Sequence, residues 1–126
     1  MKFEIVHTCI RIKDLEKSLK FYQHALGMKE VKRKDFPEDG FTLVFLGDEN
    51  GNHELELTYN YDRDTAYELG DGYSHLAMVV DDLEGAHSFH EEAGYPVTPI
   101  KGLSDGPPKI YFITDPDGYK IEIIRK

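Results

Sequence analysis

The chain has 126 residues, which is enough for one small domain or for two closely packed half-domains with a hydrophobic core. Its formal net charge of −9 argues against a nucleic-acid backbone or an anionic membrane as partner, because both require clustered lysine and arginine. No apolar run approaches the roughly 20 residues of a membrane-spanning helix, and the N-terminus lacks the apolar block of a signal peptide. With one cysteine and therefore no internal disulfide, the composition predicts a cytoplasmic protein.

The chain begins with a predicted strand over residues 2–13. Its alternation places His7, Cys9 and Arg11 on one face and apolar side chains on the other. Asp14 suits a helix N-cap, so a helix is predicted to begin there and to cover the apolar face of the sheet. Cys9 is expected to be a small, buried apolar residue rather than a functional thiol.

Three further strands complete the first half, which therefore reads as a βαβββ module over residues 1–62. Gly27 suits the left-handed end of the helix, and turn-rich segments separate the strands that follow it. These strands are expected at residues 28–34, 41–46 and 53–60. In the last of them Glu56 and Asn60 share a face, opposite the apolar face that packs in the core.

The second half, residues 73–126, repeats this order after a linker expected at residues 61–72. A strand and a helix come first, and three strands follow: residues 74–80, a helix over 83–93, a strand near Val97, and strands over 110–114 and 120–124. The segment 101–108 is too polar and too rich in glycine and proline for a core. It is therefore predicted to be a mobile loop.

The two halves also match residue by residue. At a fixed offset of 68 residues His7 falls on His75, and the Asp-Leu-Glu that opens each helix matches as well. The apolar–Glu–apolar pattern around Glu56 recurs around Glu122. If the two open faces meet at one cleft, two imidazoles and two carboxylates form a neutral N2O2 set for a divalent ion. Such an ion can polarise a carbonyl while a nearby carboxylate takes a proton from carbon.

Each of these four residues also has an ordinary structural interpretation. A strand histidine is commonly a hydrogen-bonded core residue, and a glutamate on an open strand face is commonly solvated. The repetition in two halves is what favours a metal site over these interpretations. The remaining histidines, which lie on the helices or beside a turn, are interpreted as structural: His24, His53, His87 and His90.

At these residues the chain resembles the lactoylglutathione lyase (glyoxalase I) family of the vicinal oxygen chelate superfamily. The resemblance covers nearly the whole chain and is carried by residues 7–12, 56–60, 67–70 and 115–122, together with Leu15, Ser18, Phe21, Tyr22, Leu26, Gly27, Met28, Gly72, Tyr73 and His75. It implies an α+β fold of two βαβββ modules in tandem, usually in a homodimer whose sites form between modules of different chains. The sequence itself is compatible with a site within one chain or across two.

The resemblance also implies a ligand set and a reaction. The metal ligands of the family fall on His7, Glu56, His75 and Glu122. The family isomerises the hemithioacetal of methylglyoxal and glutathione to S-lactoylglutathione, and Glu122 would move the proton through an enediolate with Glu56 able to assist. The chain lacks the N-terminal extension of zinc-dependent relatives, so it is similar to the Ni²⁺- or Co²⁺-activated type, with Zn²⁺ as an alternative.

Substrate-binding residues follow from the same resemblance. Arg11 and Asn60 match the family residues that meet the γ-glutamyl end of glutathione, while Lys101 and Lys109 are both candidates for the lysine that meets the glycine carboxylate. Tyr61 stands where the family often has tryptophan. The alternatives are another thiol, another superfamily enzyme (an epimerase, a thiol transferase or a ring-cleaving dioxygenase) and a metal-free drug-binding protein. A ring-cleaving dioxygenase of this fold uses three ligands, so a fourth ligand argues against that option.

Overall fold

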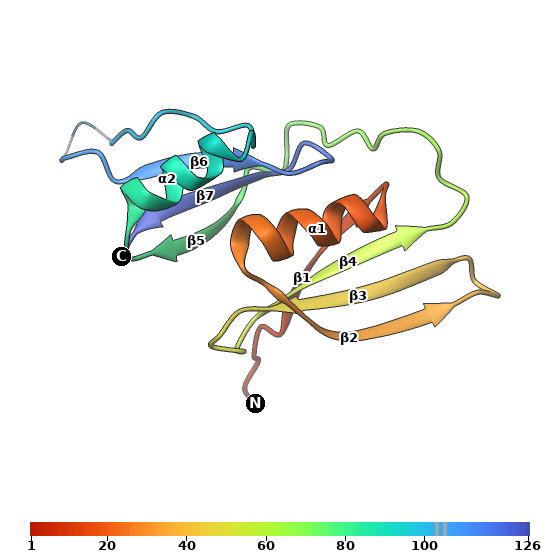
Figure 1. Cartoon of the computed structure of the whole chain (residues 1–126). Helices are drawn as coiled ribbons and strands as arrows, with labels where there is room; N and C mark the ends of the chain where they lie inside the picture. Colours follow the sequence, from red (N-terminus) through yellow and green to blue (C-terminus); the bar gives the residue numbers. More distant parts are fainter. Residues whose placement is uncertain (103, 105) are drawn as a thin grey trace. The chain divides into compact units, whose positions relative to one another are not determined.

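The computed structural model describes residues 1–102, 104 and 106–126 (Figure 1). The chain divides into two compact units, Met1–Tyr67 and Glu68–Lys126. Each unit contains a mixed sheet and one helix, so the predicted α+β class is confirmed. Residues 103 and 105 of the loop predicted at 101–108 lie outside the described residues. Among the described residues, no helix is long and apolar enough to cross a membrane.

The first unit has a four-stranded sheet with the strand order β1-β4-β3-β2. Its elements are β1 (His7–Ile12), α1 (Leu15–Leu26), β2 (Lys29–Phe36), β3 (Phe41–Gly47) and β4 (Glu54–Asn60). β1 runs parallel to β4, and the other neighbours are antiparallel. The prediction that the first strand begins at residue 2 is wrong, because β4 offers no partner beyond Glu54, whose N–H bonds the carbonyl of Val6 at 3.0 Å.

Helix α1 begins and ends at the residues that its sequence predicts. The carboxylate of Asp14 accepts from the N–H of Lys17 at 3.1 Å, and Gly27 has a φ of 66° at the C-cap. The helix buries one face, which consists of Ser18, Phe21, Tyr22 and Ala25. On β1, burial alternates as predicted, so that Ile10 and Ile12 are in the core while the intervening side chains face outward.

The second unit has a three-stranded sheet with the order β5-β7-β6. Its elements are β5 (Leu76–Val80), α2 (Leu83–Glu92), β6 (Ile110–Thr114) and β7 (Lys120–Arg125). β5 is parallel to β7, and β6 is antiparallel to it. The strand expected near Val97 forms only isolated bridges to β6, because Pro96 and Pro99 on either side of it have no N–H for a ladder.

Hydrogen bonds or close polar contacts place three of the histidines that were interpreted as structural. His90 is buried, and its Nδ1 lies 2.8 Å from the Tyr111 hydroxyl. Nε2 of His87 lies 2.9 Å from the carbonyl of Thr98, and Nε2 of His53 lies 2.9 Å from the Thr8 hydroxyl. These contacts are of the kind expected for structural histidines. His24 lies in the last turn of α1.

Candidate active site

Each unit brings one predicted histidine to one predicted glutamate. Nε2 of His7 lies 3.3 Å from Oε1 of Glu56, and Nε2 of His75 lies 3.2 Å from Oε1 of Glu122. In both units the glutamate is in the middle of the last strand, which pairs in parallel with the first strand. The histidine lies two residues before the residue that faces the glutamate in this ladder. The same ladder position therefore produces the same pair twice.

A phenylalanine completes the arrangement in each unit. Phe45 of β3 faces Glu56 in the antiparallel ladder, and Phe112 of β6 faces Glu122 in the same way. The edge-to-face contacts between each histidine ring and its phenylalanine have centroid separations of 5.6 Å and 5.3 Å. These contacts hold the imidazoles in orientation beside the carboxylates. Sequence reasoning missed both phenylalanines, although they match at an offset of 67 residues.

The donor atoms of each pair suit a shared metal ion. Two ligand atoms that each lie about 2.1 Å from one ion are separated by about 3.0 to 3.4 Å in octahedral or tetrahedral geometry. The separations of 3.3 Å and 3.2 Å fall in this range. The imidazoles keep 40% and 32% of their side-chain surface exposed, and the carboxylates keep 12% and 18%, so both pairs can be reached from solvent.

Neither pair is a complete metal site by itself. Across the described ranges 1–102, 104 and 106–126, no group of three or more His, Cys, Asp or Glu side chains is gathered to hold an ion. Each unit therefore supplies two ligands of the expected kind. A structural zinc site usually has four protein ligands and a catalytic one usually has three, so a pair must be joined by further ligands.

Cys9 does not have the buried position that its sequence predicts. The residue is exposed, on the same face of β1 as His7, and its Sγ lies 3.1 Å from the hydroxyl of Thr58. Partial desolvation raises the pKa of the Cys9 thiol, the hydrogen bond to Thr58 opposes this, and Glu56 adds to the increase. The prediction failed because residue type was weighed above the strand alternation, which had already placed Cys9 beside His7.

The two residues that the resemblance assigns to the γ-glutamyl end lie in the first unit. Arg11 is exposed on β1, on the face that also carries His7. Asn60 is the last residue of β4, and its side-chain amide donates to the Tyr67 hydroxyl at 2.9 Å. Both residues therefore belong to the strands that carry the histidine–glutamate pair.

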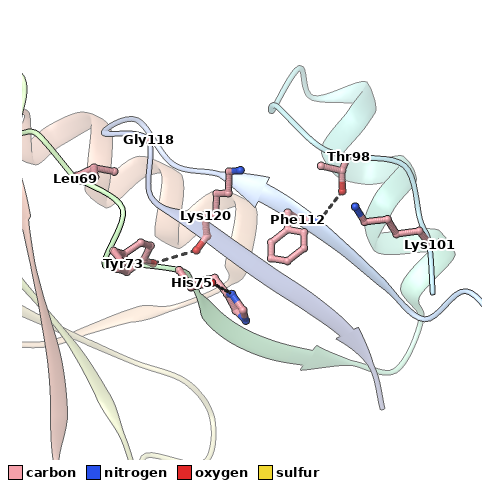
Figure 2. Close-up of a pocket in the computed structure, with 10 residues that line it drawn as sticks. Leu69, Tyr73, His75, Thr98, Lys101, Phe112, Gly118 and Lys120 are labelled. Carbon is pink, nitrogen blue, oxygen red and sulfur yellow. Dashed lines mark hydrogen bonds between the residues drawn. The ribbon is translucent and has the colours of Figure 1, made fainter. Parts of the chain in front are cut away.

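A pocket of about 510 Å³ opens in the second unit beside His75 (Figure 2). It is lined by Leu69, Gly70, Tyr73, Ser74, His75, Thr98, Lys101, Phe112, Gly118 and Lys120. The only charged side chains in this lining are those of Lys101 and Lys120, and neither forms an ion pair within the described part of the chain. In Figure 2 the ring of Phe112 lies between them. Lys109, the other candidate lysine, is not part of the lining.

Alternation along β7 could have revealed Lys120, since it lies two residues from Glu122 and hence on the same face. Thr98 had no such signal, because its segment does not form a regular strand. The pocket is therefore positively charged in a chain whose net charge is −9, which suits an anionic ligand group.

Two similar units, each with a His–Glu pair in which the glutamate comes from the last strand, define a protein built from a duplicated α+β module. The sequence model of the Glyoxalase/Bleomycin resistance protein/Dioxygenase superfamily matches residues 4–123, which is nearly the whole chain.

Known proteins narrow this class further. A lactoylglutathione lyase of Neisseria meningitidis is 46% identical over 125 residues, covering 97% of this chain and 90% of that protein. A glyoxalase I structure from Leishmania major, described as trypanothione-dependent, has a TM-score of 0.85 and 39% identity, covering 98% of this chain and 87% of the other. Glyoxalase I from Zea mays has a TM-score of 0.87 and 36% identity. That match includes 98% of this chain but only 44% of the maize chain. The chain belongs to the lactoylglutathione lyase (glyoxalase I) family of enzymes.

Proposed function

We propose that the chain isomerises the hemithioacetal of methylglyoxal and glutathione to S-lactoylglutathione by proton transfer through an enediolate. The observation that carries this proposal is the histidine–glutamate pair that recurs in both units, with N–O separations of 3.3 Å and 3.2 Å. Membership of the lactoylglutathione lyase family supports the same reaction. A cytoplasmic location belongs to the same proposal.

The two pairs together would hold one divalent ion. The four ligands would be His7, Glu56, His75 and Glu122, contributed by one chain or by two copies of the chain in a homodimer. Two neutral imidazoles and two carboxylates balance the charge of a divalent ion, and an octahedral ion would keep two positions for oxygen ligands. Ni²⁺ or Co²⁺ is favoured by the resemblance, with Zn²⁺ as the alternative. When bound, the ion supplies a Lewis acid that polarises the oxygens of the substrate.

Glu122 is the proposed proton carrier. Its carboxylate lies beside His75, and His75 lines the pocket of the second unit. A carboxylate at this position can take the proton from one carbon of the substrate and return it to the neighbouring carbon. Glu56 occupies the equivalent position in the first unit and would assist from the opposite side of the substrate.

Charged and polar groups would bind the two ends of glutathione. The guanidinium of Arg11 and the amide of Asn60 would meet the γ-glutamyl end, since a guanidinium binds a carboxylate through paired hydrogen bonds. Lys101 would meet the glycine carboxylate. It is preferred to Lys109 because it lines the pocket that contains His75.

The proposal is tested by assaying the apo protein after separate addition of Ni²⁺, Co²⁺ and Zn²⁺, with methylglyoxal and glutathione as substrates. Formation of the thioester absorbance with at least one ion is the expected result. If no ion supports thioester formation with glutathione or another thiol, the proposed reaction is wrong. Metal analysis of the purified protein then separates another metal-dependent superfamily enzyme from a metal-free drug-binding protein. The molar mass of the purified protein, measured by light scattering, tests the proposed homodimer.

A further inference from the structure

The segment between α2 and β6 changes register as it passes the pocket. Val97 pairs with Ile113, whereas Lys101 pairs with Ile110, so four steps along this segment match three steps along β6. One extra residue is therefore accommodated, as in a β-bulge. We call residues 97–101 the Thr98 bulge. Bulges redirect side chains, and two residues of this one, Thr98 and Lys101, line the pocket.

Thr98 does not complete the usual pair of ladder hydrogen bonds with Phe112. Its N–H donates to the Phe112 carbonyl at 3.0 Å, but the Phe112 N–H donates at 2.9 Å to the Thr98 hydroxyl rather than to the Thr98 carbonyl. The side chain of Thr98 therefore takes the place of its own backbone acceptor. This exchange leaves the Thr98 carbonyl available to a partner outside the sheet.

That partner is His87 of α2. Its Nε2 lies 2.9 Å from the Thr98 carbonyl, and because a carbonyl can only accept, Nε2 must carry the proton and donate. The imidazole is also held by an edge-to-face contact with Tyr111, with ring centroids 4.8 Å apart. Pro99 has no N–H, and the N–H groups of the bulge that donate to β6 are those of Thr98 and Lys101. The bond from His87 thus fixes the bulge from the helix side.

Beyond the bulge the chain resumes its pairing at Lys101. The Lys101 N–H donates to the Ile110 carbonyl at 2.9 Å, and the Ile110 N–H donates back to the Lys101 carbonyl at 3.0 Å. Gly102 then passes so close to the Pro107 carbonyl that an added Cβ would lie 2.5 Å from its oxygen. Lys101 itself is therefore held by its two backbone hydrogen bonds with Ile110. The residue after it is restrained by the close approach of Gly102 to Pro107, and the residues before it by the bond from His87.

We propose that His87 is a positioning residue for substrate binding. It holds the Thr98 bulge so that Lys101 meets the glycine carboxylate of the glutathione part of the substrate. The identity of that ligand rests on the proposed function, whereas the hold of His87 on the bulge does not. The first unit has no equivalent, because the residue at the matching offset of 68 is Leu19, whose side chain cannot donate.

The kinetic test compares His87→Leu with His87→Gln in the metal-loaded full chain. Leucine removes the donor but keeps apolar contact with Tyr111, while glutamine restores an N–H donor. We expect His87→Leu to raise KM for the hemithioacetal roughly three- to tenfold, the effect of one hydrogen bond, with kcat changed by less than about twofold. His87→Gln should recover most of this loss. His24→Leu, which removes a histidine from α1 instead, is the matched control. A fall in kcat at constant KM overturns the proposal.

A double-mutant cycle shows whether His87 acts through Lys101. In a Lys101→Met background, His87→Leu should add little to KM, because the group that it positions is already gone. Full additivity of the two substitutions would mean that His87 acts by another route and would overturn the proposal.

Hydrogen exchange provides a readout that does not require activity. His87→Leu should speed exchange at the amides of Thr98 and Lys101 and leave β5 amides unchanged. Unchanged exchange at both bulge amides overturns the proposal even if the enzyme is active. Faster exchange at these amides in a protein without lyase activity supports the hold on the bulge and refutes only the proposed function.

Discussion

The two units carry the same three side chains in the same ladder relation. In each one, a histidine near the start of the first strand, a glutamate in the middle of the last strand and a phenylalanine on the neighbouring antiparallel strand lie together. The pairing of the strands determines this geometry, and the helix sequence takes no part in it. A duplicated sheet therefore produces the same His–Glu pair twice.

The units differ in what surrounds these side chains. Opposite the glutamate, the first strand has Cys9 in one unit and Ala77 in the other. Beside the phenylalanine strand, the first unit has the eight-residue strand β2, whereas the second has only the Thr98 bulge. The pocket described above belongs to the second unit. The two units therefore share the His–Glu pairs and differ in the surface around them.

Under the proposed mechanism the largest effect is expected from removing the metal, which should abolish turnover because the ion would polarise the substrate oxygens as a Lewis acid. His7→Gln and His75→Gln each remove a proposed metal ligand. Each should weaken metal binding by about 10- to 100-fold or more, because losing a residue that only orients a ligand already costs this much. The measurement is metal content and affinity of each variant after dialysis against a chelator. Loss of binding in only one variant would show that the two pairs are not equivalent ligands.

Glu122→Gln should lower kcat by about 10²- to 10⁴-fold, because an amide cannot accept the proton that the carboxylate moves. Glu56→Gln should lower kcat less, since its unit is assigned the assisting role. Both values are read from kcat at full metal occupancy, with circular dichroism to show that the fold is kept. Turnover of Glu122→Gln close to wild type would transfer the base role to another residue. Equal losses in both variants would make the units chemically equivalent.

The two His–Glu pairs of the candidate site could be predicted from the sequence because strand alternation is a local property. The period of two placed His7 with Arg11, and the repeat linked Glu56 to Glu122. The matching of two halves gave information that no single residue carried. The structure then brings each histidine to the expected glutamate at hydrogen-bonding range or slightly beyond.

Other features depend on contacts that local patterns do not encode. Phe45 lies in a run of apolar residues, where alternation gives no face. The first strand starts at His7 rather than at residue 2 because its length is limited by the partner strand. The Thr98 bulge depends on Pro99 and on the hydrogen bond from His87 of α2 to the Thr98 carbonyl. His87 and Thr98 are 11 positions apart in the sequence.

The cores of the two units differ at Tyr111, which bonds His90 in the second unit, where the first unit has Val44 at an offset of 67. Tyr111→Phe should lower the free energy of unfolding by about 1 to 3 kcal/mol, because it removes the partner of a buried ring nitrogen. Urea titration measures this difference. A change in stability below a few tenths of a kcal/mol would show that Nδ1 of His90 does not depend on the hydroxyl.

Tyr111 also predicts a difference at alkaline pH. Burial raises the pKa of Tyr111 to about 12, above its usual value near 10. The stability that comes from keeping the phenol neutral is therefore complete below about pH 10 and is lost as the pH rises toward 12. Unfolding of wild type and Tyr111→Phe between these pH values should show a steeper loss in the wild type. Parallel curves would contradict the raised pKa.

The smallest effect is expected from Cys9→Ala, which gives the first unit the residue that the second unit has at Ala77. Turnover and metal affinity should change by less than about twofold, as for substitutions that remove no required contact. Because the pKa of the thiol is raised, Cys9 should react with iodoacetamide more slowly than a free cysteine at pH 8, and the rate should keep rising at higher pH. The alkylation rate as a function of pH measures this. A tenfold or greater loss of metal affinity in Cys9→Ala would make the thiol a ligand, and the two units would then differ in the number of metal ligands that they supply.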